Sequence, residues 1–321
     1  MPPNFKKSIL LTGAGFSKNF GGLLSREMWS KIFAHFQIKS LPNARKLLQE
    51  NFDFEDVYSR VINEPEYADE KEVFQKIIYE CFTDMDRTLE CYRPVSQEFY
   101  KIQELISLFA GSSQEIGMHF TLNQDLFLER QRRNRGLGLG GLDYKPYWEA
   151  IDTGRVNPNQ FITLPNKEWL ETYQKTHLST WNDYNYVKLH GSLGWKSSDG
   201  RAQIVLGTNK PDDIVKEPLL NWYFKLFKEA LFRPGVRILC IGYGFRDQHI
   251  NDILLEAIGL NDDFELFVIS PESAGNFKER TGEKIWSHVR AYFPFTLNEI
   301  FPTAQDPLHF YGDILKFFPK R

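Results

Sequence analysis

The amino-acid sequence predicts an α/β protein: a Rossmann-like, doubly wound parallel sheet with a helical insertion or subdomain. Short apolar runs that end in glycine or polar residues recur along the chain, and such runs are typical of buried strands. Stretches with apolar residues at three- and four-residue spacing separate these runs, which predicts helices between the strands. Strands that alternate with helices favour a parallel sheet covered on both faces.

The length and composition are those of a globular protein. The chain has 321 residues, of which 42% are hydrophobic and 25% charged, so it can bury a sizeable core. We expect a single domain over residues 1–321, with the insertion at about residues 40–110. The net charge of −3 and the pI near 6.2 give no support for nucleic-acid binding. No apolar run approaches the ~20 residues that a bilayer requires, so we expect a cytoplasmic protein with no membrane partner.

The three cysteines, Cys81, Cys91 and Cys240, are widely spaced and form no Cys-x-x-Cys pair. A disulfide framework needs paired cysteines, and a four-thiolate zinc site needs four. We therefore predict neither a disulfide framework nor a four-thiolate zinc site.

The first expected strand, Ser8 to Thr12, ends in the turn Gly13-Ala14-Gly15. A helix is expected to follow, and Ser25 is a favourable N-cap residue for it. Its apolar side chains recur at helical spacing, which is more typical of core packing than of a ligand site. They are Met28, Trp29, Ile32, Phe33 and Phe36.

Helical spacing continues from about Asn43 to Leu108, which predicts the insertion. A second strand is expected at Met118–Leu122. The segment Arg130–Gly141 then holds four arginines followed by four glycines, and such a segment is typical of a solvated loop. A phosphate-contacting or lid role for this loop is the alternative.

The remaining elements alternate between strand and helix. Strands are expected at Tyr186–Leu189, Gln203–Leu206, Val236–Ile241 and Glu265–Ile269, and helices at Pro218–Phe232 and Asp247–Ile258. The tail from Lys284 to Phe318 is expected to mix short helical pieces with loops. Because ligands of open parallel sheets bind beyond the carboxyl ends of the strands, the residues that follow each strand are the candidate site.

The turn after the first strand suits a phosphate group. Glycines let the backbone approach an anion, and the start of the following helix favours negative charge. However, Lys18 stands where a dinucleotide fingerprint has its third glycine, and no Walker Gly-Lys-Ser/Thr tripeptide follows. A purely structural turn is therefore the alternative.

Polar residues follow two further strands. Asn123 can donate and accept hydrogen bonds, and Asp125 can hold a carboxamide or a ribose hydroxyl. His190, at the next strand end, would have room beside it and a pKa near neutrality, which suits a general base. The alternatives are an ordinary Asx turn for Asn123 and Asp125, and a structural histidine for His190.

Four motifs follow these strands in order: Gly13-Ala14-Gly15-Phe16-Ser17, Thr121-Leu122-Asn123-Gln124-Asp125, His190-Gly191-Ser192 and Gly242-Tyr243-Gly244. Together they resemble the sirtuin superfamily, and specifically its bacterial sirtuin-like NAD-hydrolase branch found in antiphage defence. The resemblance spans roughly residues 8–270. Phe127, Leu128 and Glu129 also match that branch's Asn-x-Asp-x-x-Leu-Glu pattern.

The resemblance implies a role for each matching residue. Asn123 would position the nicotinamide ribose and the attacking water, and His190 would be the general base. Asp125 would hold the carboxamide. The other residues implied in NAD⁺ binding are Gly13, Ala14, Gly15 and Ser17 at the phosphates, Phe16 in the same turn, Gly191 beside His190, and Gly242, Tyr243 and Asp247 at the adenosine half.

Two departures separate the chain from protein-deacetylating sirtuins. The four zinc-binding cysteines are absent, and Gly22-Leu23-Leu24-Ser25-Arg26 stands where those enzymes have Pro-Asp-Phe-Arg. The resemblance therefore implies an NAD⁺ hydrolase, with NAD⁺ as substrate and no metal, whose products are nicotinamide and linear or cyclic ADP-ribose. The alternatives are a non-catalytic NAD or ADP-ribose sensor and a protein deacylase.

Uncontrolled NAD⁺ hydrolysis would harm the host cell, so activity would need control. We expect control by assembly into a homo-oligomer, by a partner such as a ring-forming ATPase or another component of a defence system, or by a foreign trigger.

Overall fold

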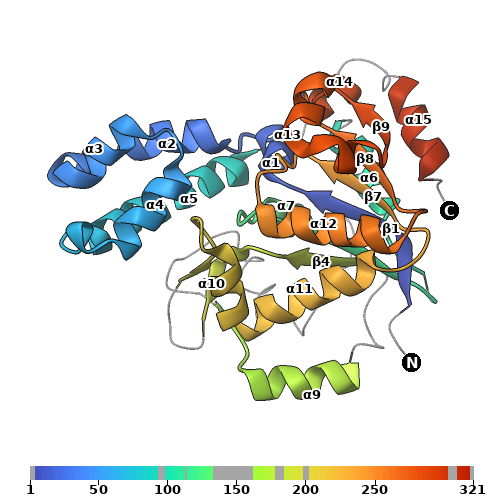
Figure 1. Ribbon diagram of the computed structural model, residues 1–321, viewed down its shortest axis with the longest axis horizontal. Helices are drawn as coiled ribbons and strands as arrows, with labels where there is room; N and C mark the ends of the chain where they lie inside the picture. Colours follow the sequence, from blue (N-terminus) through green and yellow to red (C-terminus); the bar gives the residue numbers. More distant parts are fainter. Residues whose placement is uncertain are drawn as a thin grey trace.

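A six-stranded, fully parallel sheet forms the centre of the molecule (Figure 1). The computed structural model describes residues 4–92, 98–112, 114–132, 162–177, 184–197, 202–302 and 309–318. The sheet order is β4-β2-β1-β7-β8-β9. Its strands are β1 (Phe5–Thr12), β2 (Ile116–Thr121), β4 (Tyr184–Lys188), β7 (Arg237–Ile241), β8 (Glu265–Ile269) and β9 (Val289–Phe293). The predicted fold class is confirmed.

The sheet is doubly wound, and its strand order reverses beside β1. The chain first adds β2 and β4 on one side of β1, and then returns to add β7, β8 and β9 on the other side. The carboxyl ends of β1 and β7 therefore lie next to each other, with Thr12 paired to Ile241. Such a reversal is where open α/β sheets bind ligands.

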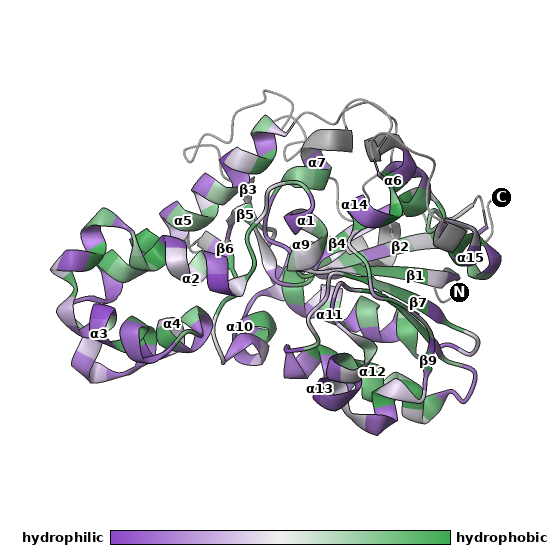
Figure 2. Ribbon diagram, turned by 90° about the horizontal axis from the view of Figure 1, so that it is seen from above, coloured by the Kyte–Doolittle hydropathy of each residue, from purple (hydrophilic) through white to green (hydrophobic). Residues whose placement is uncertain are grey.

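Helices cover both faces of the sheet (Figure 2). One face packs against α9 (Lys167–His177), α11 (Pro218–Leu231), α12 (Gln248–Leu260) and α13 (Ala274–Trp286), and these form the largest apolar core. The other face packs against α1 (Ala14–Lys18), α6 (Glu98–Ser107), α7 (Phe127–Arg132), α14 (Leu297–Ile300) and α15 (His309–Phe317) around a second core. Both sides of each central strand are thus buried, which explains their near-continuous apolar sequences.

A group of helices between β1 and β2 extends to one side of the sheet (Figure 1). It comprises α2 (Ser25–Phe33), η1 (Phe36–Ser40), α3 (Pro42–Glu50), α4 (Phe54–Asn63), η2 (Pro65–Tyr67) and α5 (Lys71–Cys91). These helices surround a third apolar core, to which Leu193 and Leu206 also contribute. The helix α2 packs in this group, whereas α6 packs on the sheet. Whether the chain acts as a single domain stays a prediction.

The strand expected at Gln203–Leu206 does not join the main sheet. Instead, β6 (Ala202–Ile204) pairs antiparallel with β5 (Gly191–Lys196), and β3 (Ile162–Thr163) completes a separate three-stranded sheet. The chain turns back directly after β4, so no crossover precedes β5 and β6. A parallel neighbour in the main sheet requires such a crossover.

Two further expectations were wrong. The tail expected to hold only helical pieces and loops contains β9, a short edge strand whose sequence Val-Arg-Ala-Tyr-Phe mixes exposed and apolar residues. The N-cap of α2 is Leu24 rather than Ser25. The Glu27 carboxylate accepts the Leu24 N–H at 2.8 Å and so satisfies a donor at the start of the helix without a polar N-cap side chain.

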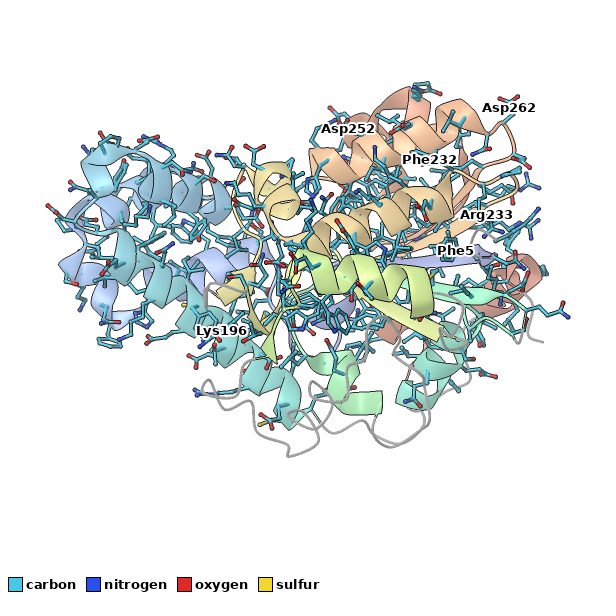
Figure 3. The ribbon with its side chains drawn as sticks, turned by 90° about the horizontal axis from the view of Figure 1, so that it is seen from below. Phe5, Lys196, Phe232, Arg233, Asp252 and Asp262 are labelled. Atoms are coloured by element: carbon cyan, nitrogen blue, oxygen red, sulfur yellow. The ribbon has the colours of Figure 1, made fainter. Side chains whose placement is uncertain are left out.

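The amino end of the sheet lies far from the insertion. Figure 3 shows Phe5, Phe232 and Arg233 at that end, with Lys196 on the insertion side. The Arg233 guanidinium donates to the Phe5 carbonyl and lies 5.9 Å from the Phe5 ring centroid. Within the described ranges, no helix has both the length and the apolar sequence needed to cross a bilayer.

Candidate functional site

The loops after β1 and β7 meet backbone to backbone. Gly13 N–H donates to the Ile241 carbonyl at 3.1 Å, and Gly15 N–H donates to the Gly242 carbonyl at 2.9 Å. A Cβ atom on Gly15 would lie 2.7 Å from the Gly242 Cα, so the contact has no room for a side chain. The amides of Gly13 and Gly15 hold the two loops together, and phosphate binding by the turn stays a prediction.

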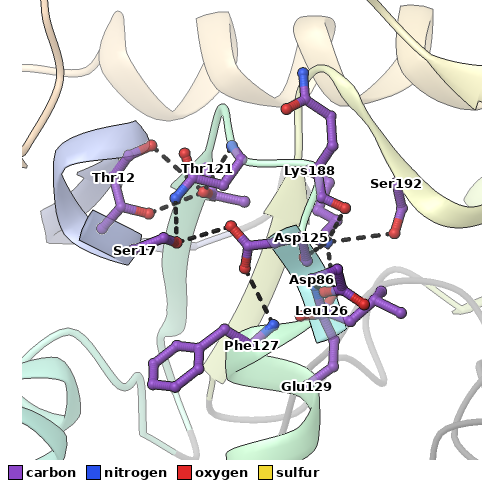
Figure 4. Close-up of polar contacts among 12 residues, drawn as sticks. Thr12, Ser17, Asp86, Thr121, Asp125, Leu126, Phe127, Glu129, Lys188 and Ser192 are labelled. Carbon is purple, nitrogen blue, oxygen red and sulfur yellow. Dashed lines mark hydrogen bonds and ion pairs between the residues drawn. The ribbon is translucent and has the colours of Figure 1, made fainter. Parts of the chain in front are cut away.

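Three predicted site residues form one buried hydrogen-bonded cluster (Figure 4). The Asn123 side-chain amide donates to the Ser17 hydroxyl at 2.9 Å and to the Gly13 carbonyl at 3.0 Å. The Ser17 hydroxyl donates to Asp125 Oδ2 at 2.7 Å. The ends of β1 and β2 are therefore joined by the residues that the sequence singled out.

A layer of buried polar side chains supports this cluster. The hydroxyls of Thr12 and Thr121 lie 2.9 Å apart, and Thr121 Oγ1 accepts Asn123 N–H at 3.1 Å. Thr12 Oγ1 also lies 2.8 Å from His119 Nε2. Burial lowers the pKa of His119 to about 3, so this imidazole is neutral and hydrogen-bonds without charge at physiological pH.

A fully buried ion pair fixes the Asn123–Asp125 loop from the other side. Lys188 Nζ lies 2.7 Å from Glu129 Oε1, and both side chains are 2% exposed. Lys188 also donates to the Asp125 carbonyl and, at 3.3 Å, to the Ser192 hydroxyl (Figure 4). Burial raises the pKa of Glu129, although Lys188 opposes the rise.

The insertion contributes to the same loop. Asp86, on α5, is 1% exposed, and its Oδ1 accepts Leu126 N–H at 2.7 Å. This hydrogen bond connects α5 directly to the segment between Asp125 and Phe127. The insertion therefore helps to shape the loop that carries Asn123.

A second polar group lies at the end of β4. His190 Nε2 lies 2.9 Å from Nε2 of His249, near the start of α12. Asp247, the N-cap residue of α12, lies 2.5 Å from Lys210 Nζ, and Lys210 lies 2.7 Å from Glu55 Oε2 on α4. A chain of polar contacts thus runs from the insertion, through α10 (Lys210–Lys216), to the start of α12.

The expected near-neutral pKa of His190 is not what the structure shows. His190 is 2% exposed, and burial lowers its pKa to about 3. Burial also lowers the pKa of the less buried His249 to about 4. Burial alone would raise the pKa of Asp247, but the Lys210 ammonium that is paired with its carboxylate lowers it. Both imidazoles are thus neutral at pH 7, beside an ionised carboxylate.

The donor atoms of His190, Asp247 and His249 lie within 4.8 Å of one another. Imidazole and carboxylate groups are ligands that transition metals use. Here, however, the two imidazole nitrogens contact each other and Asp247 is paired with the Lys210 ammonium. We therefore assign no metal to this group.

Two other predicted binding residues, Tyr243 and Phe16, are buried and have internal contacts. The Tyr243 ring is 4% exposed, and its hydroxyl donates to Asn251 Oδ1 at 2.9 Å. Phe16 is buried against Phe20, at a centroid distance of 5.4 Å. Ala14 begins α1, and Gly191 begins β5. Asp247 lies between the two groups, because its backbone carbonyl accepts the Tyr243 hydroxyl at 3.2 Å and its carboxylate lies within 4.8 Å of His190 and His249.

Several residues of these groups were not predicted from the sequence: Glu55, Asp86, Lys188, Lys210 and His249. His249 could have been found, because it follows Asp247 by two residues where a helix begins after a strand end. Lys188 lies inside an apolar strand and Glu55 inside an insertion helix. Their roles arise from contacts distant in sequence, which no local pattern predicts.

The structure describes only the first residues of the Arg130–Gly141 segment, which was predicted to be a loop. The helix α7 includes residues 130–132, so the segment begins as a helix. Residues 133–141 lie outside the described residues, and the lid and phosphate roles stay predictions.

The buried histidines predict acid destabilisation. In the unfolded chain a histidine takes up a proton near pH 6.5, whereas His119 and His190 stay neutral in the fold down to about pH 3 and His249 down to about pH 4. The unfolded state thus binds more protons below pH 6.5, and the free energy of unfolding falls as the pH drops towards 4. Each of these three histidines lowers the free energy of unfolding by up to about 1.4 kcal/mol for each pH unit of this drop.

Urea unfolding at pH 7, 6 and 5 checks this expectation. The His119→Gln variant should show a shallower fall with pH than the wild type, because one of the three groups is removed. Equal slopes in the two proteins would refute the lowered pKa of His119.

The topology and the strand-end residues define a Rossmann-like α/β protein with its polar site at the sheet's reversal point. The model of the SIR2-like domain family matches residues 118–289, which is more than half of the chain, and the chain therefore belongs to this family. Membership places it in a group of NAD-dependent proteins, in agreement with the sirtuin resemblance. The match includes Asn123, Asp125, His190, Gly242 and Asp247. No curated protein matches the chain.

Proposed function

We propose that the protein is an NAD⁺ glycohydrolase that cleaves the nicotinamide–ribose bond. The observation that carries the proposal is the cluster in which Asn123 binds Ser17 and the Gly13 carbonyl at the reversal point of the sheet. Its amide group is held in place by the ends of β1 and β2. NAD⁺ use by SIR2-like domains supports the same substrate.

The proposed reaction needs orientation more than strong acid–base chemistry. Nicotinamide leaves as a neutral base, and the ribose becomes an oxocarbenium-like electrophile. Asn123 positions the ribose and the attacking water, and Asp125 binds the carboxamide. In hydrolysis, the C–N bond to nicotinamide breaks, a C–O bond forms between the ribose and water, and His190 accepts the proton that the water loses, which gives nicotinamide and ADP-ribose. In cyclisation, a nucleophilic atom of the ADP-ribose part takes the place of water and gives the cyclic form. Orienting a bound nucleophile can lower the barrier by several kcal/mol.

Protein deacylation is the less favoured activity. Cys81 and Cys91 lie on α5 and Cys240 lies on β7, and Cys81 and Cys240 are buried while Cys91 is exposed. The three thiols cannot form the four-thiolate zinc module of protein-deacetylating sirtuins. A non-catalytic sensor of NAD⁺ or ADP-ribose is the second candidate, because the nitrogen Nε2 of His190 is already bonded to His249.

We also propose the biological setting that the sirtuin-like resemblance implies. The protein would be a single-domain, NAD⁺-depleting effector of antiphage defence in the cytoplasm. Its activity would be controlled by homo-oligomer formation or by a partner such as a ring-forming ATPase. A lone monomer with full constitutive activity would contradict this regulatory proposal.

Two substitutions test the hydrolase proposal. His190→Ala and Asn123→Ala should each lower the rate of NAD⁺ consumption by about 10²-fold or more, the scale of acid–base assistance. Chromatography of nicotinamide and ADP-ribose measures the rate, for the protein alone and with candidate partners. His288→Ala, outside the site, is the matched control. If the wild type binds NAD⁺ but turns none over in any of these conditions, the sensor function replaces the hydrolase.

A further inference from the structure

The two imidazoles at the end of β4 share one proton between their facing nitrogens. His190 Nε2 and His249 Nε2 are 2.9 Å apart. Two N–H groups cannot point at each other at this distance, so one nitrogen donates and the other accepts. When His190 is the donor, its Nδ1 carries the lone pair. That tautomer can accept a proton from a substrate.

Burial disfavours the protonated, charged form of His190. His190 is 2% exposed, and a charged imidazolium loses hydration when it is buried. His249 is only partly buried. Burial and Lys210 lower its pKa, but the carboxylates of Asp247 and Asp252 raise it. Positive charge is therefore better placed on His249 than on His190.

The other groups near His249 are compatible with this placement. The Lys210 ammonium lies between Asp247 Oδ1, at 2.5 Å, and Glu55 Oε2, at 2.7 Å, so two carboxylates offset its charge. The Phe224 ring, on α11, lies 5.6 Å from the His249 ring by centroid distance. His249 is thus flanked by an apolar ring on one element and by Asp247 at the start of its own helix.

Building on the proposed hydrolase function, we propose that His249, beside Asp247, completes a proton relay behind His190. A ribose hydroxyl loses its proton to Nδ1 of His190, while the Nε2 proton of His190 passes to Nε2 of His249. One O–H and one N–H bond break, and two N–H bonds form. His190 remains neutral and His249 becomes an imidazolium beside Asp247. His249 acts only through His190 and is a positioning residue for the base.

The His249→Gln variant tests the relay, because glutamine keeps a hydrogen-bonding side chain but takes up no proton. The kcat of NAD⁺ consumption should fall by about 10²-fold, the low end of acid–base effects. The Kd of ADP-ribose, measured by calorimetry, should stay within about twofold, since a loss of only 0.4 kcal/mol corresponds to that factor. His288→Ala should match the wild type in both measurements.

Chemical rescue separates proton transfer from packing. Imidazole added to His249→Ala should restore NAD⁺ turnover, whereas pyrazole, a ring of the same size that is a far weaker base, should not. Equal rescue by both rings would make His249 a packing residue and overturn the relay. So would turnover that EDTA abolishes and Zn²⁺ restores, because the pair would then be a metal site.

The outcomes also distinguish the relay from the hydrolase function. Wild-type turnover that His190→Ala abolishes but His249→Gln leaves unchanged would overturn the relay alone. If the wild type shows no turnover with any partner, both proposals fall together.

Discussion

Gly242→Ala is expected to lower the free energy of unfolding by about 4 kcal/mol, or to prevent folding. Gly242 has a φ of +62°, which costs a residue with a Cβ atom about 1–2 kcal/mol. The added Cβ would also lie 2.2 Å from the Phe16 nitrogen and 2.3 Å from the Gly15 carbonyl carbon. Relieving such contacts by backbone shifts typically costs a further ~1–3 kcal/mol.

Gly259→Ala provides the matched control. Gly259 lies in α12, and a Cβ there would meet no atom within 4 Å. Because alanine favours helices over glycine by about 1 kcal/mol, this variant should be as stable as the wild type or more so. Urea unfolding measures both. A Gly242→Ala protein with wild-type stability would show that the loops after β1 and β7 are not held in contact.

Lys188→Met should destabilise the fold by about 3–5 kcal/mol, the cost of leaving a buried charge without its partner. Lys188 is the ion-pair partner of Glu129, and both are 2% exposed. Without the ammonium, Glu129 should bind a proton in the folded state, so its pKa rises further above that of the unfolded chain. The difference in the free energy of unfolding between Lys188→Met and the wild type should therefore be smallest below about pH 4, where Glu129 is protonated in the unfolded chain too. This difference should grow as the pH rises.

A double variant and a surface pair test this interpretation. Removing both charges with Lys188→Met and Glu129→Met should recover part of the loss, because buried ion pairs are often replaced by apolar residues at little cost. Lys228→Met breaks the exposed pair with Glu256, whose side chains are 45% and 49% exposed, and should cost at most about 1 kcal/mol. If Lys188→Met and Lys228→Met have equal effects, the ion pair at Glu129 does not stabilise the fold.

The strands of the main sheet were largely predictable because buried parallel strands are continuous apolar runs. Glu265–Ile269 was predicted with the bounds that the structure has. The start of β1 at Phe5 was missed because Lys6 and Lys7 interrupt the apolar pattern. Lys6 is accommodated at the amino end of the strand, where its ammonium donates to the Leu108 carbonyl at 2.6 Å and the Ala110 carbonyl at 3.0 Å.

The candidate site was predictable as far as it depends on strand ends. Ser17, Asn123 and Asp125 follow two strands that the sequence indicates, and the structure brings them within hydrogen-bonding distance. The surroundings of His190 could not be predicted, since Glu55, Lys210 and His249 come from three separate helices. The pKa of His190 is set mainly by its burial, which no local pattern predicts, so the sequence suggested a near-neutral value where the structure gives a low one.

The position of β1 at the centre of the sheet bears on how the protein is made. Its two neighbours are β2, where Ile9 pairs with Met118, and β7, where Ser8 pairs with Arg237. During synthesis, this apolar strand leaves the ribosome before both of its neighbours, and the edge that pairs with β7 has no partner until β7 has followed. Such distant pairings slow folding and leave strand edges open to aggregation. The yield of folded protein in expression should therefore depend on the speed of translation and on chaperones, and not only on the stability of the folded state.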